Sequence, residues 1–189
     1  MINEIYFNDF PQMESERLLL RKLTLADAPE VQLIRSDEKV MNYMDSDKHV
    51  TIQYSENFIS ENLKMYGQKE GLFWGLIEKT SGKFIGDFAF WKIDKKNSRA
   101  EIGYVLKPEL WGKGFMKEAM IQIINFGFDD LKLHSIEANI NPENENSRGI
   151  LKKLGFKKEA YFRENYYFNG EYLDSEIYSL LKTDFQSEK

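Results

Sequence analysis

The 189-residue chain contains no cysteine and only two histidines. Without a thiol it can form no disulfide, no thiolate nucleophile and no cysteine-ligated metal site. The histidines, His49 and His134, are far apart in the sequence, so they do not form the closely spaced ligand pattern of a zinc site. We therefore expect chemistry that uses neither a metal nor a covalent cysteine intermediate, and we expect His134, which opens a predicted strand, to be structural.

An excess of positive charge is also lacking, because the net charge is −5 and the pI is near 5.3. A nucleic-acid-binding protein would show a basic field to match the phosphates. No apolar run approaches the roughly 18 residues that span a bilayer. The first 13 residues lack the basic start and apolar stretch of a signal peptide. We expect a cytoplasmic protein that binds neither nucleic acid nor membrane.

Hydrophobic residues make up 42% of the chain and aromatic residues 14%, which is typical of a folded globular protein. The length and the lack of repeats or linkers predict one domain over 1–189, with an irregular lead-in at 1–13 and a tail at 182–189. Apolar periodicity and turn residues predict strands at 17–23, 73–78, 84–90, 99–106, 135–139, 156–168 and 171–181. Helices are predicted at 24–35, 38–44, 51–66, 115–129 and 146–154.

This order predicts a mixed α/β fold in which helices flank one central sheet. Hairpins are expected in its middle and at its end, where Asn169-Gly170 is a strong two-residue turn signal.

Two glycines, Gly112 and Gly114, stand between the predicted strand that ends at Leu106 and the helix that begins near Phe115. Glycines let a backbone approach a ligand closely and turn its N–H groups to one side. The positive end of the following helix favours an anion, and a diphosphate suits such a site. Neither the Walker pattern nor the Rossmann pattern is present. A tight strand-to-helix loop without a ligand is the alternative that this local pattern leaves open.

A second segment of the sequence favours a diphosphate site over a loop without a ligand. Beyond the helix comes a strand and then NPENENSRGILKKLGF, and together with AEIGYVLKPELWGKGFMKEA it resembles the GCN5-related N-acetyltransferase (GNAT) superfamily. The opening ESERLLLRKLTLADA and the ending GEYLDSEIYSLL resemble its RimJ/RimL-like ribosomal-protein branch. The resemblance extends from Met13 to Leu181. It implies a twisted, mostly antiparallel sheet whose middle strands, 99–106 and 134–139, are splayed.

The resemblance also implies acetyl-CoA as co-substrate and assigns residues to it. The diphosphate loop falls on six consecutive residues, Gly112, Lys113, Gly114, Phe115, Met116 and Lys117. The strand beside the pantetheine arm falls on Tyr104, Val105 and Leu106, and a further contact falls on Asn144. The chain departs from the family pattern at Trp111, where Gln or Arg is usual, and at Met116, where Gly or Ala is usual.

Acetyl transfer to an amine needs a group that protonates the leaving thiolate and a route by which the amine loses its proton. Many members of the superfamily place an acidic tyrosine where this chain has Leu151, and Ser147 is the substitute in this branch. A helix-capping serine is the structural alternative. Glu101 and Glu137 are candidate bases, with Asp174 third, although solvent-facing strand residues are the alternative for each.

Trp91, Tyr161, Tyr166 and Tyr167 are candidates for the wall of an acceptor cleft, although strand aromatics more often pack in the sheet. The resemblance implies a primary amine as acceptor, such as a protein N-terminus, and a homodimer is a further expectation. A small amine, an amino acid or an antibiotic are alternative acceptors. An acyl-CoA-binding protein without turnover is the alternative from another class.

Overall fold

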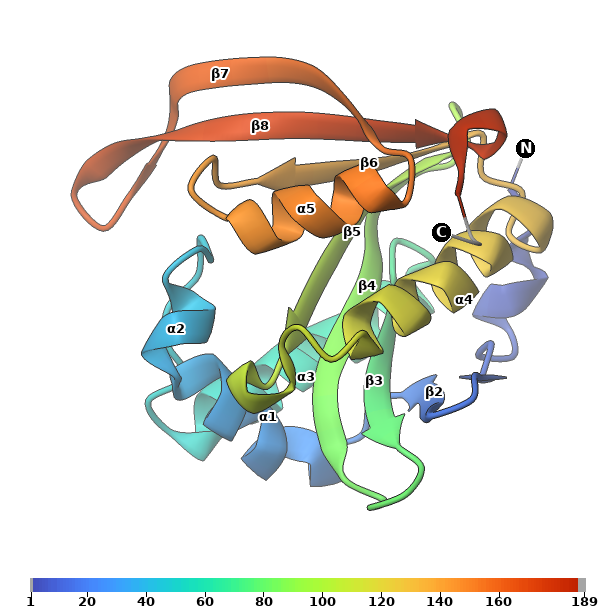
Figure 1. Ribbon diagram of the computed structural model, residues 1–189. Coiled ribbons are helices and arrows are strands. Elements are labelled where there is room, and N and C mark those ends of the chain that lie inside the picture. The colour runs from blue at the N-terminus through green and yellow to red at the C-terminus, as the bar shows by residue number, and fades with distance from the viewer. Residues whose placement is uncertain (1, 187–189) are drawn as a thin grey trace.

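A computed structural model describes residues 2–186 and shows a single eight-stranded sheet, in the order β1-β2-β3-β4-β5-β6-β8-β7 (Figure 1). The strands are β1 (Met13–Glu14), β2 (Leu18–Lys22), β3 (Leu72–Glu78), β4 (Phe84–Asp94), β5 (Arg99–Leu106), β6 (Ser135–Ile140), β7 (Lys157–Phe168) and β8 (Glu171–Leu181). The α-helices are α1 (Ala28–Ser36), α2 (Glu38–Met41), α3 (Ile52–Gly67), α4 (Phe115–Asp129) and α5 (Glu145–Lys153).

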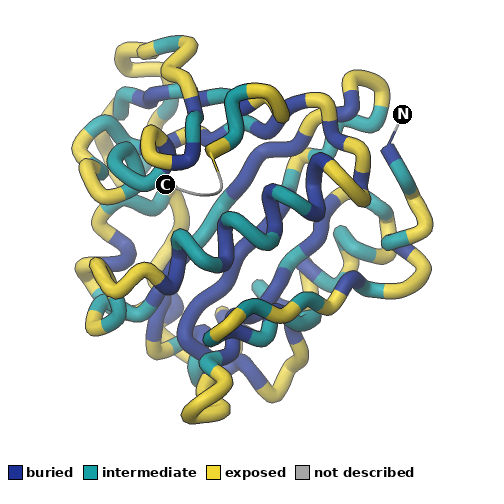
Figure 2. Tube along the Cα trace, turned by 45° about the vertical axis from the view of Figure 1, so that its right-hand side comes forward, coloured by how far each residue is buried: buried dark blue, intermediate teal, exposed yellow. Residues whose placement is uncertain are grey.

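The helices cover both faces of the sheet. On one face, α4 and α5 pack over the main core, to which Met120 and Leu151 belong. On the other face, α1, α2 and α3 enclose a smaller core around Val31 and Ile59. Buried residues are concentrated in the central strands, and the turns at the edges are exposed (Figure 2). The expected mixed α/β fold is confirmed, and in the described part of the chain no helix has the length and apolarity needed to cross a bilayer.

The sheet divides at its centre. β5 and β6 form a parallel pair, whereas every other described strand pair is antiparallel. Their pairing runs from Arg99↔Ser135 only to Ile102↔Ala138, although β5 continues to Leu106. Beyond Ile102 the two strands diverge, which confirms the expected splay.

The two ends of the chain are more ordered than the sequence predicts. The expected irregular lead-in contains a 3₁₀ helix at Glu4–Phe7, and β1 begins at its last residue. The Trp74 indole N–H donates to the Pro11 carbonyl at 2.7 Å, and Phe7 is buried. In the expected tail, the Gln186 N–H donates to the Leu154 carbonyl, and residues 187–189 lie outside the described part. Tertiary packing, which local pattern does not reveal, orders both ends.

Buried polar groups fix the segment between α2 and α3 against the sheet. The Arg35 guanidinium donates to both carboxylate oxygens of Asp87 on β4, at 2.9 and 3.1 Å. The His49 N–H donates to the Arg35 carbonyl at 3.1 Å, and His49 Nδ1 lies 2.8 Å from the Ser55 hydroxyl. Burial, with the nearby Arg35 charge, lowers the pKa of His49 to about 4.

This depressed pKa predicts a loss of stability in acid. Between about pH 6.5 and 4 the unfolded chain binds a proton at His49 that the folded chain does not, so the free energy of unfolding falls as the pH falls. At pH 4.5 the expected loss is about 2–3 kcal/mol. Urea unfolding of wild type and His49→Gln at pH 7 and pH 4.5 measures it, because glutamine does not titrate. Equal pH dependence in the two proteins would contradict the assignment.

Candidate active site

A cleft of about 390 Å³ opens where β5 and β6 diverge. It is bounded by the end of β5, the loop before α4, the start of α5 and one side of α2. Nine of the ten residues that the sequence assigns to the cofactor line it: Tyr104, Val105, Leu106, Gly112, Gly114, Phe115, Met116, Lys117 and Asn144. Ser147 lines it as well, whereas Lys113, Glu101 and Glu137 do not.

The glycine loop has the backbone that only glycine adopts readily. Gly112 and Gly114 have φ values of +73° and +81°, in the left-handed region. Gly114 is the N-cap of α4, and the Glu118 N–H bonds back to its carbonyl. The N–H groups in the first turn of a helix have no carbonyl partner within the helix. The loop therefore leads into the positive end of a 15-residue helix, where backbone donors point toward an anion.

Arg17, at the start of the segment that leads into β2, holds this loop in place. Its Nε donates to Glu118 in the first turn of α4 at 2.6 Å, and its Nη1 donates to the Lys113 carbonyl at 3.1 Å. The carbonyl and the N–H of a trans peptide point in opposite directions. Because the Lys113 carbonyl is turned toward Arg17, the Gly114 N–H of the same peptide is turned away from it.

Trp111 explains one departure from the family pattern. Its indole N–H donates to the carbonyl of Leu106 at 2.8 Å, which closes the connection between β5 and the glycine loop. The other departure, Met116, is buried in the main core and also lines the cleft. Both residues thus hold the loop to the body of the protein.

On the opposite side of the cleft, Asn144 caps α5. Its side-chain carbonyl accepts a hydrogen bond from the Ser147 N–H at 3.0 Å. The structural alternative for Ser147, a helix cap, is therefore wrong, since Asn144 occupies the N-cap position. The Ser147 side chain does not cap the helix, and it lines the cleft.

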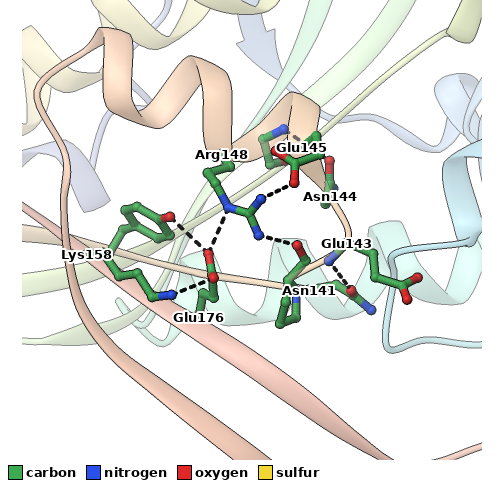
Figure 3. Close-up of polar contacts among 10 residues, drawn as sticks. Asn141, Glu143, Asn144, Glu145, Arg148, Lys158 and Glu176 are labelled. Carbon is green, nitrogen blue, oxygen red and sulfur yellow. Dashed lines mark hydrogen bonds and ion pairs between the residues drawn. The ribbon is translucent and has the colours of Figure 1, made fainter.

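A charged network beneath α5 holds the edge of the cleft that the start of α5 forms (Figure 3). Arg148 donates through Nε to Glu176 on β8 at 3.0 Å, and it also bonds Glu145 and the Pro142 carbonyl. Lys158 on β7 donates to the other oxygen of Glu176 at 2.6 Å. Arg148 thus ties the turn that carries Asn144 and Ser147 to the last hairpin.

Glu176 is 4% exposed, yet it remains charged. Burial opposes the charge, but donation by Lys158, Arg148 and the Tyr178 hydroxyl outweighs burial and lowers the pKa of Glu176 to about 2. Because three side chains donate to Glu176, we expect that removing one of these donors destabilises the edge of the cleft at α5.

The candidate bases lie at the closed end of the β5–β6 pair, where Glu101 and Glu137 are in register. Glu101 is buried beside Lys92 at 2.8 Å, and burial raises its pKa, while Lys92 opposes that rise. Glu137 pairs with Arg99 at 2.6 Å. Asp174 accepts hydrogen bonds from the Tyr161 hydroxyl and the Glu164 N–H, which lower its pKa and make it a poor base.

None of the candidate acceptor-wall aromatics lines this cleft. Tyr166 on β7 instead reaches across to the segment after α2, where its hydroxyl donates to Asp45 at 2.9 Å. Tyr161 and Tyr167 are exposed, and Trp91 is stacked beneath the Lys92 ammonium group.

Sequence reasoning missed the α2 side of the cleft. Lys39, Val40, Tyr43 and Met44 line it although they precede the glycine loop by about 70 positions. Local pattern carries no signal for such a contact, because it depends on tertiary packing, in which Val40 and Val105 belong to the same buried cluster.

The chain matches the family model of the acetyltransferase (GNAT) domain over residues 17–157. The chain belongs to the GNAT family. This GNAT protein is 37% identical over 173 residues to the uncharacterized N-acetyltransferase p20 of Bacillus licheniformis, covering 90% of this chain and 96% of p20. It is 32% identical over 136 residues to YdaF of Bacillus subtilis (strain 168), provisionally named a ribosomal N-acetyltransferase, covering 72% of this chain and 73% of YdaF. Its activity is accordingly that of an acetyltransferase.

More distant relatives show a range of acceptors. The spermidine N(1)-acetyltransferase of Vibrio cholerae is 22% identical over 171 residues, covering 90% of this chain and 96% of that enzyme. Among solved structures, a GNAT acetyltransferase from Bacillus anthracis superposes with a TM-score of 0.81 at 29% identity, covering 92% of this chain and 99% of that one. The ribosomal L7/L12 acetyltransferase RimL, solved with coenzyme A, shares the fold with a TM-score of 0.83 at 18% identity, covering 90% and 98%.

Within residues 2–186 no group of three or more acidic or histidine side chains is placed to hold a metal ion.

We expect Arg148→Met to lower the free energy of unfolding by about 2–3 kcal/mol. The substitution keeps the length of the side chain but leaves the buried Glu176 with one donor fewer. The exposed Arg163 on β7 is a matched control, and Arg163→Met should change stability by less than about 0.5 kcal/mol. Urea denaturation at pH 7 compares the two, and equal losses would show that the Arg148 network contributes nothing specific.

Proposed function

We propose that this GNAT protein transfers the acetyl group of acetyl-CoA to the N-terminal amine of a protein or peptide. The diphosphate would be held by the loop from Gly112 to Lys117, with Lys113 and Lys117 supplying positive charge. The pantetheine arm would lie along Tyr104, Val105 and Leu106, with Asn144 on the far side. Bound there, acetyl-CoA supplies the activated acetyl group.

The open edge of β5 supports this placement. Beyond Ile102 the edge of β5 that faces away from β4 has no strand partner on β6, so backbone groups on that edge before the Leu106 carbonyl, which Trp111 occupies, can pair with a peptide-like ligand. The pantetheine arm contains two amide groups and can pair with such an edge. The glycine loop lies at the far end of the same edge, where the positive end of α4 suits a diphosphate.

In this proposal the residues around the cleft have separate roles in the transfer. Ser147 faces the cleft from α5 and donates a hydrogen bond toward the departing sulfur. Glu101, and behind it Glu137, receive the proton of the amine through water, because neither carboxylate lines the cleft itself. Glu101 pairs with Lys92 and Glu137 with Arg99, and Lys92 opposes the rise that burial causes in the pKa of Glu101.

The position of the candidate bases is the observation that favours an N-terminal amine, because neither lines the cleft and each is paired with a cation. An α-amine has a pKa of about 8, so a useful fraction is neutral at pH 7 without help. A lysine side chain, with a pKa near 10.4, needs a stronger base than an ion-paired glutamate. The similarity to YdaF and RimL points the same way.

A small polyamine is the second candidate acceptor, since a spermidine acetyltransferase is among the relatives. The sequence-based expectations of a homodimer and of a cytoplasmic location stay predictions.

Mass spectrometry of acceptors after incubation with acetyl-CoA tests the proposal. We expect peptides with a free N-terminus to be acetylated faster than N-terminally blocked, lysine-containing peptides or spermidine. The rate at low peptide concentration should rise with pH and level off near pH 8, following the amine. Preference for spermidine would favour the second candidate. Binding of acetyl-CoA without acetylation of any amine would refute the proposal.

Gly114→Val should weaken acetyl-CoA binding at least tenfold, which corresponds to about 1.4 kcal/mol. A β-branched residue is strained at φ +81° and blocks close approach to the backbone N–H groups. Gly82→Val is a matched control, because Gly82 has φ +67° in an exposed turn with open space around it. Calorimetry should show similar losses of stability in both variants but a loss of affinity only in Gly114→Val. Equal affinities would place the diphosphate elsewhere.

A further inference from the structure

The hydroxyl group of Tyr104 is an anomaly within the cleft. Its oxygen is buried from solvent, and no hydrogen-bond partner stands within ordinary geometry among the residues that the structure describes. Buried polar groups in folded proteins are nearly always hydrogen-bonded, since leaving one unpaired is unfavourable. An unpaired hydroxyl at the wall of a ligand cleft therefore points to a group on the ligand.

The position of Tyr104 in the sheet specifies which part of the ligand it meets. Tyr104 follows Ile102 by two residues on the same face of β5, just beyond the last pair with β6. Its ring is stacked on the buried Phe88, with centroids 5.8 Å apart and planes at 10°. The stacked ring is thus held beside the point where β5 and β6 diverge, and it lines the cleft together with the start of α5.

Ser147 lies at the same point, from the other side of the cleft. Both residues line the cleft, and the Ser147 side chain lies near enough to influence the phenol, although it makes no hydrogen bond of ordinary geometry with it. Burial raises the pKa of Tyr104 to about 12, and Ser147 opposes that rise only in part. The phenol therefore keeps its proton at neutral pH and acts as a donor.

We propose that the Tyr104 hydroxyl donates a hydrogen bond to the sulfur of the bound acetyl-CoA and stabilises the departing thiolate. This inference rests on the proposed function, because it needs acetyl-CoA in this cleft. In the transfer, the amine nitrogen forms a bond to the acetyl carbon and the bond from that carbon to sulfur breaks. The electron pair of the broken bond stays on sulfur, and the amine gives up one proton through water.

The phenol does not hand over its own proton. Burial raises the pKa of the phenol well above that of a thiol, which is about 8.5, so transfer from Tyr104 to the thiolate is unfavourable. The thiolate leaves with the phenol hydrogen-bonded to it and takes its proton from water. Tyr104 thus acts through charge-assisted hydrogen bonding, which is stronger for the thiolate than for the neutral thioester.

Tyr104→Phe separates this role from a structural one. The variant removes a hydroxyl that has no partner in the free protein, so the melting temperature without ligand should be unchanged or higher. The kcat should fall about tenfold or more, while the KM for acetyl-CoA changes less than threefold. Tyr66→Phe, on α3 and away from the cleft, is the matched control and should keep full kcat.

Binding gives a readout that does not depend on turnover. Calorimetry at pH 8 should show that wild type prefers CoA to desulfo-CoA, which lacks the sulfur, and that Tyr104→Phe loses about tenfold of that preference. An equal loss of affinity for both ligands would place the hydroxyl on another part of the arm and overturn the inference. So would an unchanged kcat in Tyr104→Phe with an active wild type. A wild type that acetylates no amine would instead refute the proposed function.

Discussion

The parallel pair of β5 and β6 holds together for only four residues on each strand, and the cleft exists because the pairing stops there. On the paired side, Glu101 and Glu137 sit in register beneath their cationic partners. On the open side, the backbone of β5 faces empty space that a peptide-like ligand can fill. The connection through α4 allows this geometry, since parallel strands need a long crossover and its helix begins at the open end.

Two arginines keep the sides of the cleft apart and in shape. Arg17 bonds the glycine loop and the first turn of α4, and Arg148 bonds the turn before α5 to the last hairpin. Each brings together segments that are distant in sequence, and each pairs with a carboxylate that is largely shielded from water. A network of this kind is costly to break, because the remaining charge is left without its partner. The loop and the turn are thereby ordered before any ligand arrives.

The charges near the site are arranged for a substrate that needs little activation. Both candidate bases are paired with cations and lie outside the cleft lining, and the groups that face the cleft beside the proposed sulfur position are hydroxyls. In the proposed function, such a site acts on the leaving group more directly than on the attacking amine. This balance accords with an acceptor whose amine is partly neutral at the pH of the reaction.

The sequence alone determined the order of the elements and the location of the glycine loop. Leu106, Gly112 and Gly114 are close together in the chain, so strand end, loop and helix start follow from local patterns and turn chemistry. The same holds for the turn at Asn169-Gly170, where both residues have positive φ. The resemblance in two motifs was specific enough to give the family and the splayed sheet, because both depend on residues that lie within short segments.

Only the tertiary structure decided what surrounds those motifs. The α2 side of the cleft, the bonds from Arg17 to the glycine loop and the bond from Arg148 to Glu176 each depend on segments that meet through packing. The partner of a charge is equally invisible in sequence: Glu101 and Glu176 are both glutamates on strands, yet burial raises the pKa of one and converging donors lower that of the other. A hydroxyl without a partner, as at Tyr104, can be recognised only once every neighbour has a position, because satisfaction of a polar group is a property of three-dimensional distance and not of sequence.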